Sequence, residues 1–153
     1  MADTSLNENR IGLLIWQISN LWQSKVRAIL KNSNISFNEY LIIETIYKLQ
    51  SFNNNIRQQD ISSASSLDRS VVSVKLPVLL KKKLILKMSP QDRRSDRIIL
   101  SSSGILLIKN LLNDIETQED DIFKKLDLEI FNFTNSLKLL LGKKIRIKAK
   151  LND

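Results

Sequence analysis

The sequence predicts a mainly α-helical domain that carries one small β-hairpin. Apolar residues recur every three or four positions through most of the 153 residues, which is the spacing of amphipathic helices. Two short apolar runs flank the turn-forming segment 89–92, which favours a hairpin there. Only three glycines and two prolines are present, too few for the turns of a β-sandwich. We expect a single domain over residues 1–153.

Apolar spacing and one capping pattern predict the first two helices. A long helix covers 11–30, and the polar residues 32–34 interrupt it. Ser36 is the expected N-cap of the second helix, because Glu39 three residues later completes a capping box. This helix ends before the polar stretch 51–55. The apolar positions of the two helices are Ile11, Leu14, Ile15, Ile18, Trp22, Val26, Ile29 and Leu30, then Tyr40, Ile43, Ile46 and Tyr47.

Two shorter helices are expected next. The first covers 56–65, with Ile61 and Ala64 facing inward, and the pair Ser65-Ser66 breaks it. The second runs from about residue 67 to residue 82. Its inward face is predicted from a spacing of four and three residues between Val72, Leu76 and Leu79.

The hairpin and two further helices complete the predicted order. The strands are expected at 84–88 and 96–100. Helical spacing returns from Ser102, and Gly142 ends or bends the last helix. The apolar positions of these two helices are Ile105, Ile108, Leu112, Ile115, Ile122 and Leu126, then Ile130, Phe133, Leu137, Leu140 and Leu141.

The composition argues against an enzyme. With no Cys and no His, the chain has no thiolate zinc site, no catalytic triad and no His metal ligand. The acidic cluster 119–121 occupies adjacent helical positions that do not converge on one point, so we expect a solvated face and no metal site. No glycine-rich phosphate loop is present. We therefore expect no catalytic activity, cofactor or metal.

The N-terminal segment 1–10 is polar and mixes acidic with basic residues, unlike a secretory signal. The longest apolar runs, such as 105–108, are too short to span a bilayer. We expect a cytoplasmic protein without a membrane partner. An alternative is that the basic tail 143–150 binds anionic lipid, although a solvated helix end or extra DNA phosphate contacts would explain the same residues.

The positive charge is concentrated in one part of the chain. The net charge is +8, and residues 68–97 contain nine basic and three acidic side chains. Residues 114–129 contain seven acids and two lysines, whereas 138–153 contain six basic residues and one acid. Charge runs often form a solvated surface without a partner. Here the basic block coincides with a helix and the following hairpin, which favours double-stranded DNA as the partner.

Two short helices followed by a basic hairpin predict a winged helix-turn-helix, with the fourth helix in the major groove. The hairpin segment 92–104, DRRSDRIILSSSG, closely resembles the wing motif of the MarR family of transcriptional regulators, with Ser101 in place of the family's Thr. Segment 67–73 resembles the start of the family's recognition helix, and 56–64 resembles the helix before it. The resemblance covers about residues 10–145.

The resemblance implies a homodimer and a repressor. It places dimerisation helices at 10–32 and 102–150 and a winged helix-turn-helix DNA-binding region at 36–101. The apolar stripes on the terminal helices suit dimerisation, although packing within one chain would account for part of them. Many members release DNA when a small aromatic compound binds. Aromatic residues on the first two helices that could line such an effector pocket are Trp16, Phe37 and Tyr40, which core packing would also explain.

The residues expected to contact DNA lie on the fourth helix and in the wing. With Val72 facing inward, the outward side of the helix has few side chains suited to hydrogen-bonded base readout, and Arg69 lies near its N-terminus. Arg94 matches the family's wing arginine, which enters an A·T-rich minor groove, and Asp92 would orient it. The expected contacts are Arg69, Ser70, Ser73, Val74, Pro77 and Lys81 on the helix and Asp92, Arg93, Arg94 and Arg97 in the wing.

Two positions depart from the family pattern. Pro77 lies inside the recognition helix, where it removes a backbone donor, so the helix either kinks or relies on tertiary packing. Lys83 occupies the place where the family often has Gly before the first wing strand, so that turn could differ. Pro77 also motivates an alternative: a diverged winged-helix protein that acts with a protein partner and binds DNA weakly or non-specifically.

Overall fold

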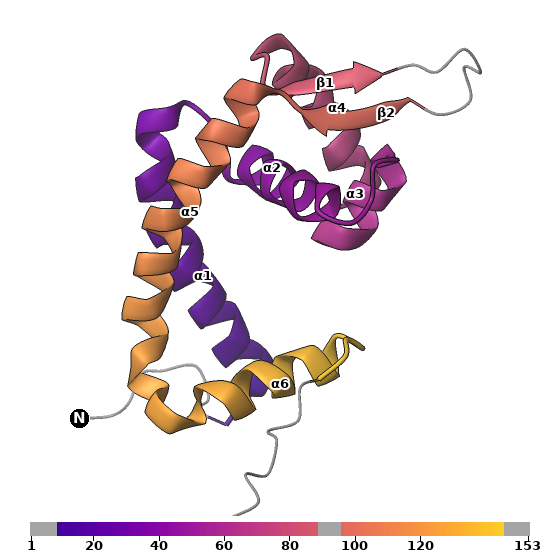
Figure 1. Ribbon diagram of the computed structural model, residues 1–153. Coiled ribbons are helices and arrows are strands. Elements are labelled where there is room, and N and C mark those ends of the chain that lie inside the picture. The colour runs from indigo at the N-terminus through magenta and orange to yellow at the C-terminus, as the bar shows by residue number, and fades with distance from the viewer. Residues whose placement is uncertain (1–8, 89–95, 146–153) are drawn as a thin grey trace, which may run out of the picture. The chain divides into compact units, whose positions relative to one another are not determined.

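A computed structural model describes residues 9–88 and 96–145. The elements follow the predicted order (Figure 1): α1 (Ile11–Leu30), the 3-10 turn η1 (Lys31–Ser33), α2 (Phe37–Gln50), α3 (Gln58–Ser65), α4 (Arg69–Lys81), β1 (Ile85–Met88), β2 (Arg97–Leu100), α5 (Ser102–Phe123), the 3-10 segment η2 (Lys124–Glu129) and α6 (Ile130–Leu140). Contacts divide the chain into two compact units that meet between Glu116 and Thr117. The predicted mainly helical fold with one hairpin is confirmed.

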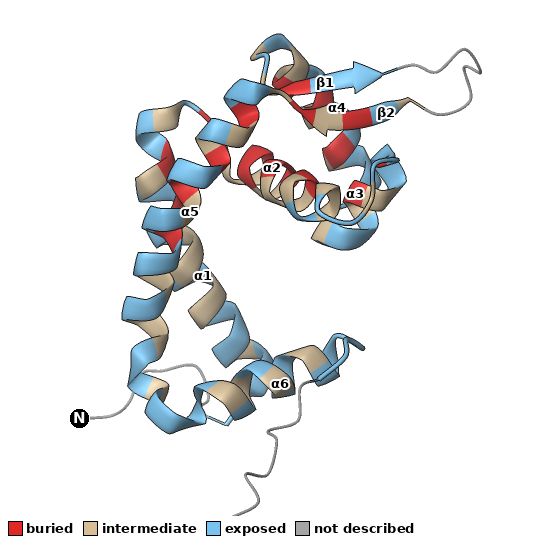
Figure 2. Cartoon of the chain, viewed as in Figure 1, coloured by how far each residue is buried: buried red, intermediate tan, exposed pale blue. Residues whose placement is uncertain are grey.

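The first unit has one apolar core. Figure 2 shows buried positions on α2, α3, α4 and the hairpin. The predicted inward residues of the fourth helix are all buried. The core residues are Val26, Leu30, Ile35, Tyr40, Ile42, Ile43, Ile46, Ile56, Ile61, Val72, Leu76, Leu79, Ile85, Ile98, Leu100, Ile108, Leu111 and Ile115.

The start of α2 confirms the predicted capping box. The Ser36 hydroxyl accepts a hydrogen bond of 3.2 Å from the Glu39 amide, and the Ser36 amide donates one of 2.7 Å to Glu39 Oε2. Two amides that have no partner inside the helix are thereby satisfied.

The prediction that Ala64 faces inward was wrong. Ile61 is fully buried as expected, but Ala64 is exposed and Ser62 and Ser65 are half-buried. The Ser62 hydroxyl donates to the Leu67 carbonyl at 2.7 Å. The inner face of this two-turn helix therefore includes serines whose polar groups are satisfied locally.

Helix α4 runs without a break through Pro77, which lies inside it. It ends in the left-handed turn for which glycine is favoured, since Lys83 has φ 59°. The Leu84 amide donates to the Leu79 carbonyl at 3.1 Å, and the Lys83 amide donates to the Leu80 carbonyl at 3.0 Å. This pair of bonds defines a Schellman motif. The turn before the hairpin therefore has the conformation usual for glycine, although Lys83 occupies its left-handed position.

The strands β1 and β2 are antiparallel, with Ile85 opposite Leu100 and Met88 opposite Arg97. The outer edge of β2 is also bonded. The Ile98 amide donates to the Ile56 carbonyl at 2.9 Å, and the Leu100 amide donates to Gln50 Oε1 at 2.7 Å. The base of the hairpin is therefore fixed to the end of α2 and to the α2–α3 connection.

The second unit contains the end of α5, then η2 and α6. The helical spacing predicted one helix through Leu126, but α5 ends at Phe123 and Asp127 has φ 47° and ψ −118°. The rings of Phe123 and Phe133 pack with centroids 6.3 Å apart. Gly142, with φ 67°, ends the last helix as expected. Exposed apolar side chains of this unit include Leu128, Ile130, Leu137, Leu139, Leu140 and Leu141.

Candidate nucleic-acid interface

The outward side of α4 is a continuous exposed surface. Because a helix repeats every 3.6 residues, burial of Val72, Leu76 and Leu79 turns the opposite side to solvent. Val74 is 66% exposed despite being apolar. Every residue expected to contact DNA from this helix is exposed: Arg69, Ser70, Ser73, Val74, Pro77 and Lys81.

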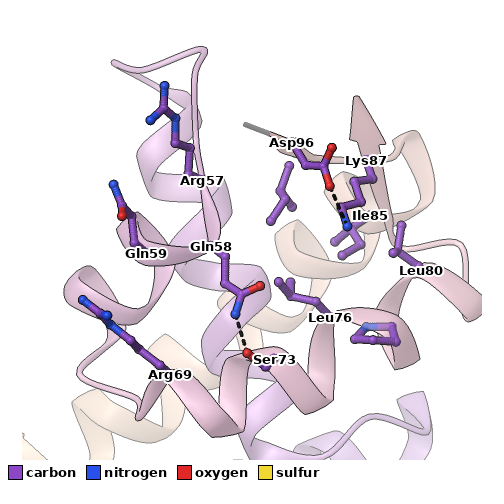
Figure 3. Close-up of a pocket in the computed structure, with 12 residues that line it drawn as sticks. Arg57, Gln58, Gln59, Arg69, Ser73, Leu76, Leu80, Ile85, Lys87 and Asp96 are labelled. Atoms are coloured by element: carbon purple, nitrogen blue, oxygen red, sulfur yellow. Dashed lines mark hydrogen bonds and ion pairs between the residues drawn. The ribbon is translucent and has the colours of Figure 1, made fainter. Parts of the chain in front are cut away.

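A pocket of about 520 Å³ lies beside this surface, between α3, α4 and the hairpin (Figure 3). Its apolar floor includes Leu76, Ile85 and Ile98, which belong to the core. Its polar lining brings together three cationic side chains and one acid: Arg57, Arg69, Lys87 and Asp96. The fold thereby places positive charge from three separate elements next to the exposed side of α4.

One cation of this pocket has an acidic partner. Lys87 Nζ of β1 lies 2.8 Å from Asp96 Oδ2, which precedes β2, and both side chains are partly exposed. Arg57 and Arg69 are exposed, and they lie at the start of α3 and α4 respectively. Figure 3 shows both arginine side chains directed away from the pocket floor. Each helix start also carries an acid, since the Arg57 amide donates to Asp60 Oδ2 at 2.8 Å and Asp68 is the N-cap residue of α4. The two arginine side chains are therefore the source of positive charge on this surface.

Ser73 is joined to the preceding helix. Gln58 Nε2, in the first turn of α3, donates a hydrogen bond to Ser73 Oγ on α4, as the dashed line in Figure 3 shows. The sequence placed Ser73 outward as a base or phosphate contact, and exposure agrees with that placement. The hydroxyl accepts from Gln58 and keeps its own proton for a further acceptor. Gln58 and Ser73 therefore form one polar unit across the two helices.

The structure describes only part of the wing. Arg97 is exposed at the start of β2. Asp92, Arg93 and Arg94 lie outside the described residues, so their expected roles stay predictions.

The end of the wing motif holds the hairpin to α5. The Ser101 hydroxyl accepts from the Gly104 amide at 3.0 Å, which caps α5, and donates to the Lys83 carbonyl at 2.7 Å. A Cβ on Gly104 would lie 2.1 Å from the Leu84 carbonyl oxygen, closer than any real contact. The serine and the glycine thus have a structural role, since they allow α5 to begin directly against the strand entry.

Sequence reasoning missed five polar residues of this pocket: Arg57, Gln58, Gln59, Lys87 and Asp96. The first three come at the start of α3 and, with Asp60, precede its first buried residue, Ile61. In the sequence they form a polar run at a helix N-terminus, a pattern that indicates only a solvent-facing segment. Their place beside α4 becomes visible only in the folded structure. Lys87 was counted in the basic block without a role.

The three aromatic residues expected to line an effector pocket are not equivalent. Trp16 is 60% exposed, whereas Tyr40 is buried and its hydroxyl donates to Glu44 Oε2 at 2.5 Å. The ring centroids of Phe37 and Tyr40 are 5.9 Å apart. Trp22 packs edge-on against Phe37, with ring centroids 5.4 Å apart. None of the three lines the pocket beside α4 or a second pocket of about 500 Å³ near η1 and α5. Their effector role stays a prediction.

A buried carboxylate lies behind α4. Glu39 is 3% exposed and is the only charged residue buried among those described. Its Oε1 lies 2.8 Å from Lys82 Nζ, and its Oε2 lies 3.9 Å from Lys75 Nζ. Burial raises the pKa of the Glu39 carboxyl, but hydrogen bonds from Lys82 and Ser36 and the Lys82 charge together hold this pKa below its ordinary value.

The described residues contain neither a membrane-spanning helix nor a cluster of metal ligands. No helix in them is long and apolar enough to cross a membrane. Nor does this part of the chain hold three grouped His, Cys, Asp or Glu residues able to bind a metal ion.

No family model and no curated protein matches the sequence. Solved structures do match. A Rhodococcus sp. RHA1 transcriptional regulator of the MarR family has TM-score 0.79 and 14% identity, covering 94% of this chain and 100% of that one. A MepR–DNA complex from S. aureus has TM-score 0.76 and 24% identity, with 90% and 98% covered. NadR in complex with 4-hydroxyphenylacetate has TM-score 0.73 and 21% identity, with 92% and 97% covered.

An exposed helix after a short helix, followed by a two-stranded hairpin, defines a winged-helix structure. More particularly, this is the fold of the MarR-family regulators, so the fold that the resemblance implied is confirmed. The matched neighbours are transcriptional regulators and none of those described above is an enzyme.

Proposed function

We propose that the chain is a sequence-specific, double-stranded DNA-binding transcriptional regulator. The observation that carries the proposal is the exposed side of α4, bordered by a pocket to which Arg57 and Arg69 contribute positive charge, whereas Lys87 there pairs with Asp96. A helix of this kind fits the major groove, and cations on either side of it suit the phosphates. The fold likeness to MepR, which has been solved with DNA, supports the same mode of binding.

The regulator acts as a homodimer on an A·T-rich, pseudo-palindromic operator and represses transcription. Exposed apolar side chains on both terminal regions support dimerisation, since single chains rarely leave such helix faces open to water. They include Ile11, Leu14, Ile15 and Trp16 on α1 and Leu137, Leu139 and Leu140 on α6. Sedimentation of the purified protein should give the mass of two chains, and a monomer at micromolar concentration would contradict this part.

The decisive experiment is fluorescence anisotropy against duplexes that the protein itself enriches from a randomised pool, compared with shuffled duplexes over a salt series. We expect tighter binding to the enriched duplexes and a steep fall of affinity with salt for both. Arg69→Ala should weaken binding about tenfold or more. Lys109→Ala, which removes an exposed cation of α5 outside the pocket, is the matched control. Equal affinity for both duplexes would refute sequence specificity.

A small aromatic effector that releases the DNA is the second part of the proposal. Neighbours have been solved with 4-hydroxyphenylacetate and with p-coumaroyl-CoA. The cluster of Phe37, Tyr40 and Trp22 supports an aromatic ligand here. Adding 4-hydroxyphenylacetate to the protein–DNA complex should lower the anisotropy, and Phe37→Ala should abolish that response. An unchanged anisotropy with a panel of such acids would exclude this ligand class.

A further inference from the structure

Glu39 connects three segments that are distant in sequence. From the third position of α2, its carboxylate holds Lys82 just beyond α4 and lies within ion-pair distance of Lys75. Lys82 Nζ also donates to the Asn34 carbonyl at 2.7 Å, in the turn before α2. The recognition helix is thereby tied at two points to the start of α2.

The spacing of the two lysines gives this contact a directional effect. Lys75 and Lys82 are seven residues apart, so they lie two turns apart on the same side of the helix path. Apolar packing of Val72, Leu76 and Leu79 favours burial but is non-directional. Two charged contacts to one carboxylate instead restrict both the rotation of α4 about its axis and its position along it.

Stability alone is a weak reason for such a buried charge. Removing a carboxylate from water costs much of the energy that its ion pairs return, and apolar replacements of buried pairs are often equally stable. We propose that Glu39 is a positioning residue for DNA recognition, holding α4 through Lys82 and Lys75 at the orientation in which its exposed side reads the bases. This inference rests on the proposed function.

A loss of orientation and a change in net charge affect DNA binding in different ways. Replacing Glu39 with Gln makes the protein more positive by one charge, which favours non-specific binding to phosphates. Loss of orientation acts in the opposite direction, and only on the sequence-specific part of the affinity. Specific and non-specific affinity should therefore change differently, whereas unfolding would lower both.

The test is Glu39→Gln in the full chain, with anisotropy on a duplex that the wild type enriches from a randomised pool and on its shuffled version. Gln has the same shape and also completes a capping box with Ser36. We expect at least a tenfold loss of affinity for the enriched duplex, equal to about 1.4 kcal/mol. Affinity for the shuffled duplex should stay unchanged or rise.

Two control variants separate the alternatives. Glu116→Gln makes the same chemical change at an exposed position of α5 and should leave the ratio of the two affinities unchanged. Ser36→Ala removes the capping hydroxyl but keeps the Glu39 charge, so it should lower the melting temperature without changing that ratio.

Several results would overturn the inference. One is an unchanged ratio of the affinities for the enriched and shuffled duplexes in folded Glu39→Gln. Another is an equal loss of affinity for both duplexes that matches the unfolded fraction of the variant. An equal loss of specificity in Ser36→Ala would show that Glu39 affects DNA binding only through the capping box of α2. If the wild type itself enriches no duplex, the proposed function fails first, and the positioning role fails with it.

Discussion

The Ser101 hydroxyl donates a 2.7 Å hydrogen bond to the carbonyl of Lys83, across the base of the wing. It links the residue that caps α5 to the left-handed residue that ends α4. Helix α4, the hairpin and α5 therefore meet at one point, and small changes there should have measurable effects on stability.

Lys83→Gly should stabilise the protein. A lysine at φ 59° meets a steric cost of about 1–2 kcal/mol, part of which glycine's larger unfolded-state entropy offsets. We expect a gain of about 0.5–1 kcal/mol in the free energy of unfolding, measured by urea denaturation. Lys81→Gly is the control, since it places glycine in the last turn of α4 and should destabilise. A loss of stability in Lys83→Gly would show that the lysine side chain has contacts that outweigh the turn.

Gly104→Ala should destabilise the protein by about 1–3 kcal/mol, because the added methyl would overlap the Leu84 carbonyl and the backbone must move. Gly12→Ala is the matched control. Its Cβ would meet nothing within 4 Å in α1, so alanine should be neutral or stabilising by up to about 1 kcal/mol. Thermal unfolding of both variants measures the difference, and equal melting temperatures would contradict the close approach.

Stability should depend on pH through Glu39. Lys82, Lys75 and Ser36 face its carboxylate, and its folded-state pKa lies below the ordinary value of 4.5. A lowered pKa means that the carboxylate stabilises the fold above the unfolded-state pKa, and that this contribution is lost as pH falls through the folded-state pKa. At pH 7, Glu39→Gln should be less stable by about 1–3 kcal/mol. Urea denaturation from pH 7 downward should show the gap to wild type narrowing below about pH 4.5; a constant gap would refute the assignment.

Arg94→Ala should weaken operator binding by about 1–3 kcal/mol, because a wing arginine in a narrow minor groove meets enhanced negative potential. Anisotropy on the enriched duplex checks this. Lys109→Ala again serves as the control that removes one positive charge outside the interface. Unchanged affinity in a folded Arg94→Ala dimer would remove the wing from the proposed interface.

Features set by neighbouring residues could be predicted from the sequence. The capping box of Ser36 and Glu39 spans three residues, and the buried side of α4 follows from helical periodicity. The prediction for Ala64 failed because the inner face of α3 includes serines that satisfy their own polar groups. Short helices give periodicity too few turns to decide such a face.

Long-range partners could not be predicted. Glu39 and Lys82 are separated by 43 positions, and Gln58 and Ser73 by 15, so no local pattern links them. Each pair forms only once the helices have packed. The cationic pocket beside α4 has the same origin, since its lining comes from α3, α4 and both sides of the hairpin.

The outer edge of β2 has a consequence for the behaviour of the protein in concentrated solution. Arg97–Leu100 is short, β-prone and largely apolar, which makes an exposed strand edge prone to intermolecular pairing. The Ile56 carbonyl and the Gln50 side chain already occupy the amides of Ile98 and Leu100. A strand from another molecule would have to displace both, so this side of the wing is protected against aggregation.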